Sequence, residues 1–210
     1  MNKKKLYVVW KGKKKGVFDT WDECKKSIDG YKGAEYKAFP DLTAATKASK
    51  ETYAKYKGVA QPKVAISAEK RALIGNPEMD TIAVDAACSG NPGIMEYQGV
   101  ETRSKKIIFK KGPFKNSTNN IGEFLALVHA LAFLKKQNKY TPIYSDSKIA
   151  IGWVNRKRVN TKLVRDASNE DSFELIDRAL KWLHTNDYPN KIIKWETKVW
   201  GEIPADFGRK

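Results

Sequence analysis

The first forty residues alternate short apolar runs with polar turns, which is the pattern of a small α/β unit. Residues 6–10 and 16–18 form two apolar runs around a turn rich in Lys and Gly, and residues 34–39 form a third run. Between them, residues 20–29 have the composition of a helix. Thr20 stands at its N-cap with Glu23 three positions later, as in a capping box. The pattern predicts three strands and one helix.

The middle of the chain shows no clear period. Residues 40–57 are rich in helix formers but have little apolar periodicity, and residues 58–80 contain two prolines without a regular pattern. We expect a first domain over residues 1–50 and a linker over residues 51–78.

From residue 79 onward, strand and helix patterns follow one another. Apolar residues recur at positions 121, 124, 125, 128, 131 and 134, which is helical spacing. Further patterns predict strands over 81–87, 94–104, 105–112, 141–146 and 191–196, and helices over 147–157, 172–185 and, at the end of the chain, 203–210. This order predicts an α/β domain over residues 79–210, with a mixed sheet and helices on its faces.

Composition narrows the kind of partner. The net charge of +16 over 210 residues indicates a polyanion such as a nucleic acid. Two cysteines, Cys24 and Cys88, provide neither a disulfide framework nor a zinc site. No apolar stretch approaches the ~20 residues of a membrane span. We therefore expect a cytoplasmic monomer with no membrane contact and no protein partner.

Four acidic residues stand at unusual positions in this basic chain. Asp85 lies within an apolar strand pattern, and Glu123 lies near the start of the long helix. Asp146 ends a strand, and Asp206 lies in the terminal segment. A carboxylate inside a strand is costly unless it is paired or bound to a metal. Simpler interpretations remain for the others: Glu123 can favour a helix N-terminus, Asp146 can cap the next helix, and Asp206 can be a surface residue.

The segments around these residues resemble, in order, the motifs of type 1 ribonuclease H, closest to its bacterial branch. The motifs are VDAACSGNPG, TNNIGEFLALVHAL, IYSDSKIAIGWV and WGEIPADFGRK. This resemblance covers residues 79–210 and implies the family's mixed five-stranded sheet with flanking helices. Residues 6–39 resemble the small α/β hybrid-binding domain that precedes some ribonuclease H domains.

The resemblance implies an endonuclease that hydrolyses the RNA strand of RNA–DNA hybrids and leaves 3′-OH and 5′-phosphate ends. Its cofactor would be two Mg²⁺ ions about 4 Å apart, with Mn²⁺ as a substitute. Mg²⁺ prefers hard oxygen ligands. The resemblance assigns this role to Asp85, Glu123, Asp146 and Asp206, with Asp85 bridging the ions.

Other residues near the acidic set receive supporting roles. By the same resemblance, Glu202 assists the exchange of metal and water, although Pro204 interrupts a helix between it and Asp206. We expect His129 to be structural and His184 to face solvent.

Contacts to the hybrid follow from the same resemblance. The turn residues Ser89, Gly90 and Asn91 would face the RNA strand, whose 2′-OH distinguishes it from DNA. Asn119 and Asn120 would lie in the minor groove, and a DNA phosphate would be held by Thr118, Asn120 and Thr161. As a bare motif, the segment 88–93 is read first as a plain hairpin turn.

Two lysines depart from the family pattern. Lys162 replaces a small hydroxyl residue beside the phosphate pocket. Lys148 replaces a Gln of close relatives and would reach a phosphate or a groove acceptor.

In the first domain, the resemblance assigns Tyr7, Trp21, Tyr36 and Lys37 to the nucleic acid. Trp21 and Tyr36 would pack on DNA sugars and Lys37 would contact a phosphate, while Ala38 stands where the family has a basic residue. Lysines at 3, 4, 5, 11, 13, 14 and 15 would add salt-dependent affinity. The alternative is that the aromatic residues form the core of this small domain and the lysines are solvated.

Two other functions remain open at this point. One is a non-catalytic protein that binds RNA–DNA hybrids or double-stranded RNA, which loss of a carboxylate would favour. The other is a DNA-cutting integrase or transposase of the same fold, which the motifs that read the 2′-OH do not support.

Overall fold

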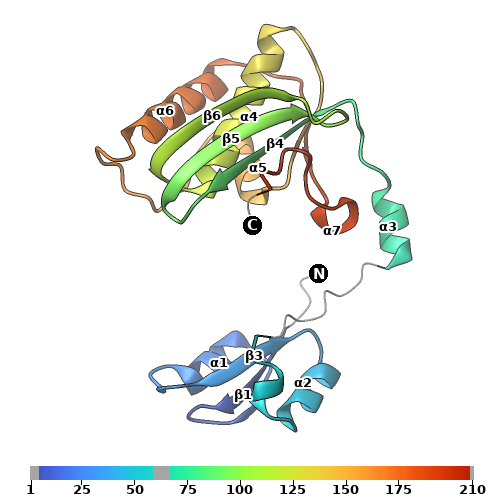
Figure 1. Ribbon diagram of the computed structural model, residues 1–210, viewed down its shortest axis with the longest axis vertical. Coiled ribbons are helices and arrows are strands. Elements are labelled where there is room, and N and C mark those ends of the chain that lie inside the picture. The colour runs from blue at the N-terminus through green and yellow to red at the C-terminus, as the bar shows by residue number, and fades with distance from the viewer. Residues whose placement is uncertain (1–4, 59–66, 209–210) are drawn as a thin grey trace. The chain divides into compact units, whose positions relative to one another are not determined.

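The computed structural model describes residues 5–58 and 67–208 and divides the chain into two compact units, Met1–Ala65 and Ile66–Lys210 (Figure 1). Lys3 and Lys4 lie outside the described residues. The expected domain boundaries at residues 50 and 78 remain a prediction.

The first unit is built on a three-stranded antiparallel sheet with the order β2-β1-β3. The three predicted strands are confirmed as β1 (Leu6–Lys11), β2 (Gly16–Phe18) and β3 (Glu35–Phe39). Helix α1 (Trp21–Ile28) starts with the predicted capping box, because Thr20 and Glu23 each accept a hydrogen bond from the other's backbone N–H.

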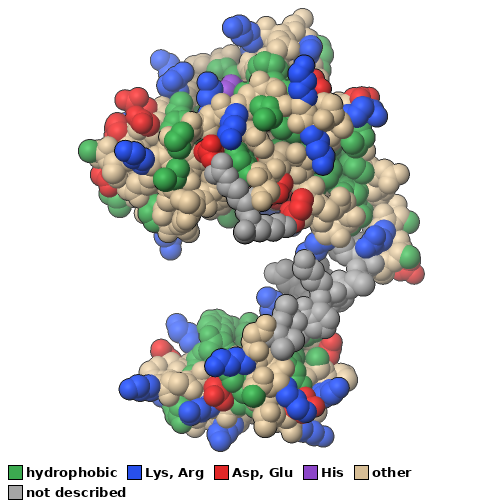
Figure 2. All heavy atoms as spheres, in the orientation of Figure 1, with side chains coloured by type: hydrophobic (Ala, Val, Ile, Leu, Met, Phe, Trp, Pro, Cys, Tyr) green, Lys and Arg blue, Asp and Glu red, His purple; other side chains and the backbone are tan. Residues whose placement is uncertain are grey.

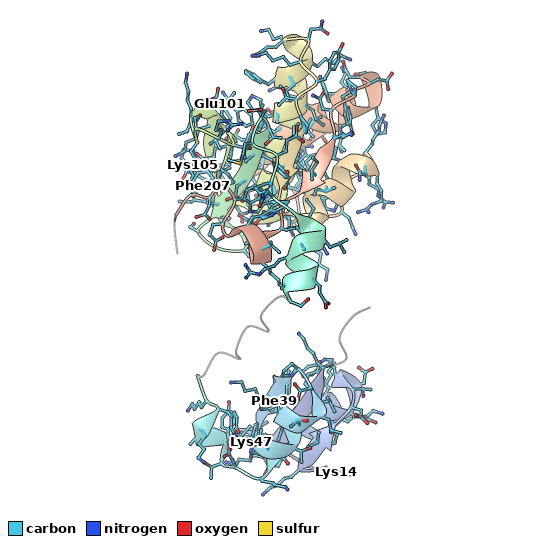
Figure 3. All side chains as sticks on the ribbon, turned by 90° about the vertical axis from the view of Figure 1, so that its right-hand side faces the viewer. Lys14, Phe39, Lys47, Glu101, Lys105 and Phe207 are labelled. Atoms are coloured by element: carbon cyan, nitrogen blue, oxygen red, sulfur yellow. The ribbon has the colours of Figure 1, made fainter. Side chains whose placement is uncertain are left out.

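The core of the first unit lies between the sheet and helix α2 (Leu42–Ser49). It contains Leu6 and Val8 from β1, Phe39 from β3 (labelled in Figure 3) and two alanines of α2. Burying these apolar side chains stabilises a domain that is small for a single core.

The chain folds back onto this core after α2. It passes through a short 3-10 helix, η1 (Tyr53–Lys55). The indole Nε1 of Trp10 donates to the carbonyl oxygens of Ala48 at 3.1 Å and Glu51 at 2.7 Å. The ring of Tyr56 stacks on Trp10, with 5.5 Å between ring centroids. Residues up to Tyr56 therefore pack within the first unit.

The second unit contains the expected mixed five-stranded sheet, in the order β6-β5-β4-β7-β8. An antiparallel meander contains β4 (Ile82–Cys88), β5 (Gly93–Glu101) and β6 (Ile107–Ser117). Parallel pairing then adds β7 (Ile143–Ser145) beside β4 and β8 (Ile192–Lys194) beside β7.

The two faces of this sheet are covered differently. Helices α4 (Asn119–Lys136), α5 (Lys148–Asn155) and α6 (Glu170–Thr185) pack over one face, which receives Val84 of β4 (Figure 1). Side chains alternate along a strand. The neighbouring Ala83 accordingly joins a smaller cluster with Tyr144, Trp195, Ile203 and Ala205. The C-terminal segment thus covers the face opposite the long helices.

The structure adds one helix to the elements expected from the sequence and removes another. Residues 58–80, whose pattern predicted no particular element, contain helix α3 (Ala68–Ile74). The predicted terminal helix over 203–210 is wrong, because residues 203–208 are not helical and a short helix α7 (Thr197–Trp200) precedes them. The carbonyl oxygen of Ala205 accepts a hydrogen bond from the buried Gln98 side chain instead of from a helix. Residues 209 and 210 lie outside the described part.

The surface agrees with the basic composition. Figure 2 shows Lys and Arg side chains spread over the visible surface of both units. Among the described residues, no helix combines the length and apolar character needed to cross a membrane.

Candidate active site

Three of the four predicted carboxylates meet at one end of the sheet. Asp85 comes from the middle of β4, Glu123 from the second turn of α4, and Asp146 directly follows β7. Each offers an oxygen, and these oxygens all lie within 4.8 Å of one another. Strands β4 and β7 are parallel neighbours in which Val84 pairs with Ser145. The next residues along the two strands, Asp85 and Asp146, therefore lie beside each other.

A glycine allows α4 to approach β4 closely at this point. A Cβ added to Gly122 would lie 2.7 Å from the Cβ of Ala86, closer than side chains tolerate. The absent side chain brings the next residue, Glu123, against the strand that carries Asp85.

Burial and mutual repulsion make these carboxylates hard to ionise without a cation. Asp85 and Glu123 are each 8% exposed. Burial, with a smaller contribution from the charges of Asp146, Glu123 and Asp206, raises the pKa of Asp85 to about 8. Burial likewise raises the pKa of Glu123 to about 7, and it raises the pKa of Asp146.

Hydrogen bonds orient Glu123. The side-chain amide of Asn119 donates to its Oε1 at 3.0 Å, and the side chain of Ser147 also bonds to it and lowers its pKa. Ser147 is also the N-cap of α5, accepting from the backbone N–H of Ala150 at 3.1 Å. The simpler interpretation of Asp146 as this cap is therefore wrong.

Asp206 and Glu202 lie beside this group of three, at exposed positions of the C-terminal segment. Gln98, which pairs with Asp85 across β4 and β5, donates from Nε2 to the carbonyl oxygen of Ala205 at 2.7 Å. The segment is thereby tied to the sheet next to Asp85. The charge of Asp206 raises the pKa of Asp85 and Asp146, and that of Glu202 raises the pKa of Asp146.

The donor set fits a divalent metal ion. Hard carboxylate oxygens are the ligands that Mg²⁺ and Mn²⁺ accept. Crowded carboxylates with raised pKa values gain stability when a cation replaces their protons. The residues present could therefore hold such an ion between Asp85, Glu123 and Asp146, with Asp206 beside them.

The predicted phosphate-pocket residues gather around a separate cavity of about 360 Å³. Thr118, Asn120 and Thr161 line it together with Asn91 and Lys162. Thr118 also caps α4 by accepting from the N–H of Ile121 at 3.4 Å.

The β4–β5 turn holds Ser89, Gly90 and Asn91 at exposed positions. The Ser89 hydroxyl accepts from the backbone N–H of Ile94 at 2.9 Å, and a Cβ on Gly93 would meet the nitrogen of Gly90 at 2.4 Å. The segment is thus a tight hairpin turn that leaves its backbone accessible. Lys148, the first residue of α5, is also exposed.

In the first unit, three predicted aromatic residues form one partly exposed cluster. The ring centroids of Tyr7 and Trp21 are 5.4 Å apart and those of Trp21 and Tyr36 are 5.9 Å apart. Trp21 is 42% exposed and Tyr36 is 39% exposed, so the alternative that these two form the core is wrong.

Lys37 lies apart from this aromatic cluster. It follows Tyr36 on β3 and therefore points to the opposite face. There its Nζ donates to the carbonyl oxygen of Tyr56 at 2.6 Å.

The two histidines lie where the sequence places them. His129 stacks on Phe109 with 4.0 Å between centroids and is half-buried, as a structural residue would be. His184 is exposed near the end of α6.

Sequence reasoning missed three residues of the site: Ser147, Gln98 and Lys194, whose positive charge lowers the pKa of Glu123 and of Asp146. Ser147 and Gln98 act through contacts that no periodicity reveals. Lys194 left one signal, a charged residue closing the apolar strand pattern IIK.

The fold and the acidic cluster define an α/β protein with a site that could hold a cation. Residues 77–196 match the family described as RNase H, and residues 5–49 match the family described as Ribonuclease H1 N-terminal domain. The first match covers more than half of the chain, and the chain belongs to the ribonuclease H family. Glu202 and Asp206 lie beyond the matched residues.

Curated relatives carry the name ribonuclease H. That of Caldanaerobacter subterraneus subsp. tengcongensis is 34% identical over 111 residues, which cover 48% of this chain and 68% of the relative. That of Saccharomyces cerevisiae is 54% identical over 34 residues, which cover 16% of this chain and 10% of the yeast protein. The chain thus spans about a tenth of the yeast relative's length.

Two solved RNase H1 structures are similar to part of this chain. LC11-RNase H1, isolated from compost by a metagenomic approach, has 19% identity and a TM-score of 0.34, covering 58% of this chain and 89% of its own. RNase H1 from the halophilic archaeon Halobacterium salinarum NRC-1 has 21% identity and a TM-score of 0.36, covering 56% and 87%.

Proposed function

We propose that this protein is an endonuclease that hydrolyses the RNA strand of RNA–DNA hybrids and leaves 3′-OH and 5′-phosphate ends. One observation carries the proposal: the carboxylate oxygens of Asp85, Glu123 and Asp146 lie within 4.8 Å of one another in a chain of the ribonuclease H family. A protein that only bound nucleic acid would gain nothing from placing repelling carboxylates at its binding surface.

The cofactor in this proposal is a pair of Mg²⁺ ions, for which Mn²⁺ can substitute. Asp85, Glu123, Asp146 and Asp206 would hold them. When bound, the ions would make water more acidic and neutralise charge on the phosphate that is attacked and on the leaving oxygen.

The chain's own residues supply the positioning. Glu123 is oriented by Asn119 and Ser147 before any ligand arrives, so little reorganisation is needed when the site fills. In the proposal, Glu202, exposed at the edge of the site, assists exchange of metal, water and product.

The substrate would lie across the exposed turn and the 360 Å³ cavity. Ser89, Gly90 and Asn91 would face the RNA strand, Asn119 and Asn120 the minor groove, and Lys148 a phosphate. A DNA phosphate would enter the cavity beside Thr118, Asn120 and Thr161, where the charge of Lys162 adds attraction.

The first unit would bind the duplex by itself. Its Tyr7–Trp21–Tyr36 cluster offers exposed rings that can pack on sugars, and its lysines supply salt-dependent affinity. In the proposal, Lys37 contacts a phosphate by exchanging its hydrogen bond to Tyr56 for it. Tethering this unit to the catalytic unit raises the local concentration of substrate.

Cleavage assays on hybrid, duplex RNA and duplex DNA test the proposal, with and without Mg²⁺. Wild type should cut only the hybrid and only with the metal. Glu123→Gln should lose at least about 10²-fold in rate while binding hybrid as wild type does. Glu174→Gln, an exposed residue of α6, is the matched control and should cleave normally.

Two results would count against the enzyme. Normal turnover by Glu123→Gln would show that cleavage does not require the acidic cluster. A wild-type protein that binds hybrid but cleaves none of the three duplexes would support the non-catalytic binding protein instead.

A further inference from the structure

Lys194 is the last residue of β8 and lies partly buried beside the acidic cluster. The parallel register pairs it with Ser145 of β7, and the residue after Ser145 is Asp146. Lys194 thus ends the edge strand of the sheet, one position in register from the metal-ligand candidate Asp146.

The side chain of Lys194 lies on the same side of the sheet as Glu123. Paired residues on neighbouring strands share a face, and the register aligns Lys194 with Ser145 and Ser145 with Val84. Val84 packs in the core that α4 covers, and α4 carries Glu123.

The ammonium group is held near the two carboxylates. Its Nζ donates to the backbone carbonyl oxygen of Trp195, which restricts the long side chain. Its positive charge lowers the pKa of Glu123 and of Asp146, against the stronger effect of burial. Lys194 therefore interacts electrostatically with two members of the acidic cluster at once.

We propose that Lys194 is a positioning residue for the metal site: its ammonium group is the resident counter-cation of Glu123 and Asp146, and it limits how tightly the site holds a divalent ion. This inference rests on the proposed function, because it concerns the same carboxylates.

Two effects of opposite sign follow from a fixed positive charge at this place. In the metal-free protein it offsets repulsion among the carboxylates and so stabilises the fold. Toward a divalent cation it is a like charge and weakens binding. A lysine with a merely structural role would not produce this pair, because losing it would lower stability without tightening metal binding.

The test uses the full chain with Lys194→Met, which keeps much of the stem but removes the charge. Calorimetric titration with Mg²⁺ at a pH of about 9 places the measurement above the pKa of Asp85, so that bound protons do not mask the metal. Thermal unfolding without metal is the second readout.

We expect Lys194→Met to bind Mg²⁺ about tenfold more tightly than wild type and to unfold at a lower temperature without metal. Lys194→Arg, which keeps the charge, should restore both properties to within about twofold of the wild-type affinity. Lys191→Met is the matched control: it removes an exposed lysine just before β8 and should leave both readouts unchanged. Lys194→Gln removes the charge but keeps a donor for the Trp195 carbonyl, and it replaces the Met variant if that variant does not fold.

Wild-type or weaker Mg²⁺ affinity in the uncharged, folded variant overturns the inference while leaving the proposed function intact. A wild-type protein that binds neither Mg²⁺ nor Mn²⁺ overturns the proposed function, and the inference with it.

Discussion

The indole Nε1 of Trp200 donates a hydrogen bond of 2.8 Å to the carbonyl oxygen of Gly75, which lies 125 positions earlier in the chain. Close to this contact, the backbone N–H of Glu78 donates to the Tyr144 hydroxyl at 3.0 Å, and the rings of Tyr144 and Trp200 meet edge to face. Residues 75–78, predicted as the end of a linker, are thus attached to the segment that leads to Glu202 and Asp206.

Trp200→Phe tests whether this attachment stabilises the second unit. The variant keeps an aromatic ring but loses the N–H donor, so we expect the free energy of unfolding to fall by about 0.5–1.5 kcal/mol. Thermal or urea unfolding checks this. Trp182→Phe is the control for the general loss of ring size, because Trp182 is a half-buried residue of α6. If both variants lowered the free energy of unfolding equally, the hydrogen bond to Gly75 would make no specific contribution.

The metal-free protein should lose stability as the pH rises from about 4 to 8. The pKa of Asp85 is about 8 in the folded protein, against 3.8 for an unperturbed carboxyl group, so within this range the folded state binds a proton that the unfolded state has released. Asp85→Asn should flatten this dependence and stabilise the metal-free protein near pH 8, by an amount on the order of a few kcal/mol.

Melting temperatures measured across this pH range without metal check this expectation. Asp187→Asn, at an exposed position, is the control. If metal-free wild type and Asp85→Asn showed the same dependence of stability on pH between 4 and 8, Asp85 would ionise normally.

Glu202→Gln should slow steady-state turnover more than it weakens hybrid binding. Glu202 is exposed at the edge of the acidic cluster and its charge reaches Asp146, which suits a role in exchange rather than in holding the ions. Single-turnover and steady-state rates should therefore differ more in the variant than in wild type. Glu174→Gln is the control, and wild-type rates in both assays would make Glu202 a surface residue.

Trp21→Ala should weaken hybrid binding without unfolding the first unit. The indole is 42% exposed and the core is formed by other residues, so the cost in stability is small. Loss of one ring from a nucleic-acid surface should weaken binding by about fivefold or more. Tyr31→Ala, another exposed aromatic residue of this unit, is the control, and circular dichroism that shows an unfolded first unit would contradict the expectation.

Deleting residues 1–58 should raise KM on long hybrids and reduce processivity while kcat stays within about twofold of the full chain. The boundary is placed after Tyr56 because this ring packs on Trp10 of the first unit. The difference in KM should shrink at high salt, since lysine contacts release counterions. If KM and the product-length distribution at low salt were unchanged by the deletion, residues 1–58 would not act as a tether to the substrate.

The local pattern of the chain was enough for most of the secondary structure. The capping box at Thr20 and Glu23 and the long α4 depend on contacts between near neighbours. The strands show in the sequence as short apolar runs or alternating patterns, although their pairing is long-range. The four carboxylates could be named because the segments around them resemble the ordered motifs of ribonuclease H, and their role as metal ligands stays a prediction.

Only the tertiary structure decided how these residues meet. Ser147 bonds to Glu123, Gln98 holds the C-terminal segment, and the charge of Lys194 acts on Asp146. These interactions join elements that are far apart in the sequence, and they leave no local period. The predicted terminal helix is absent from the described residues, where the carbonyl oxygen of Ala205 instead accepts a long-range hydrogen bond from Gln98. Burial, which raises the pKa of Asp85 to about 8, is likewise a property of the assembled sheet and not of the strand that carries the residue.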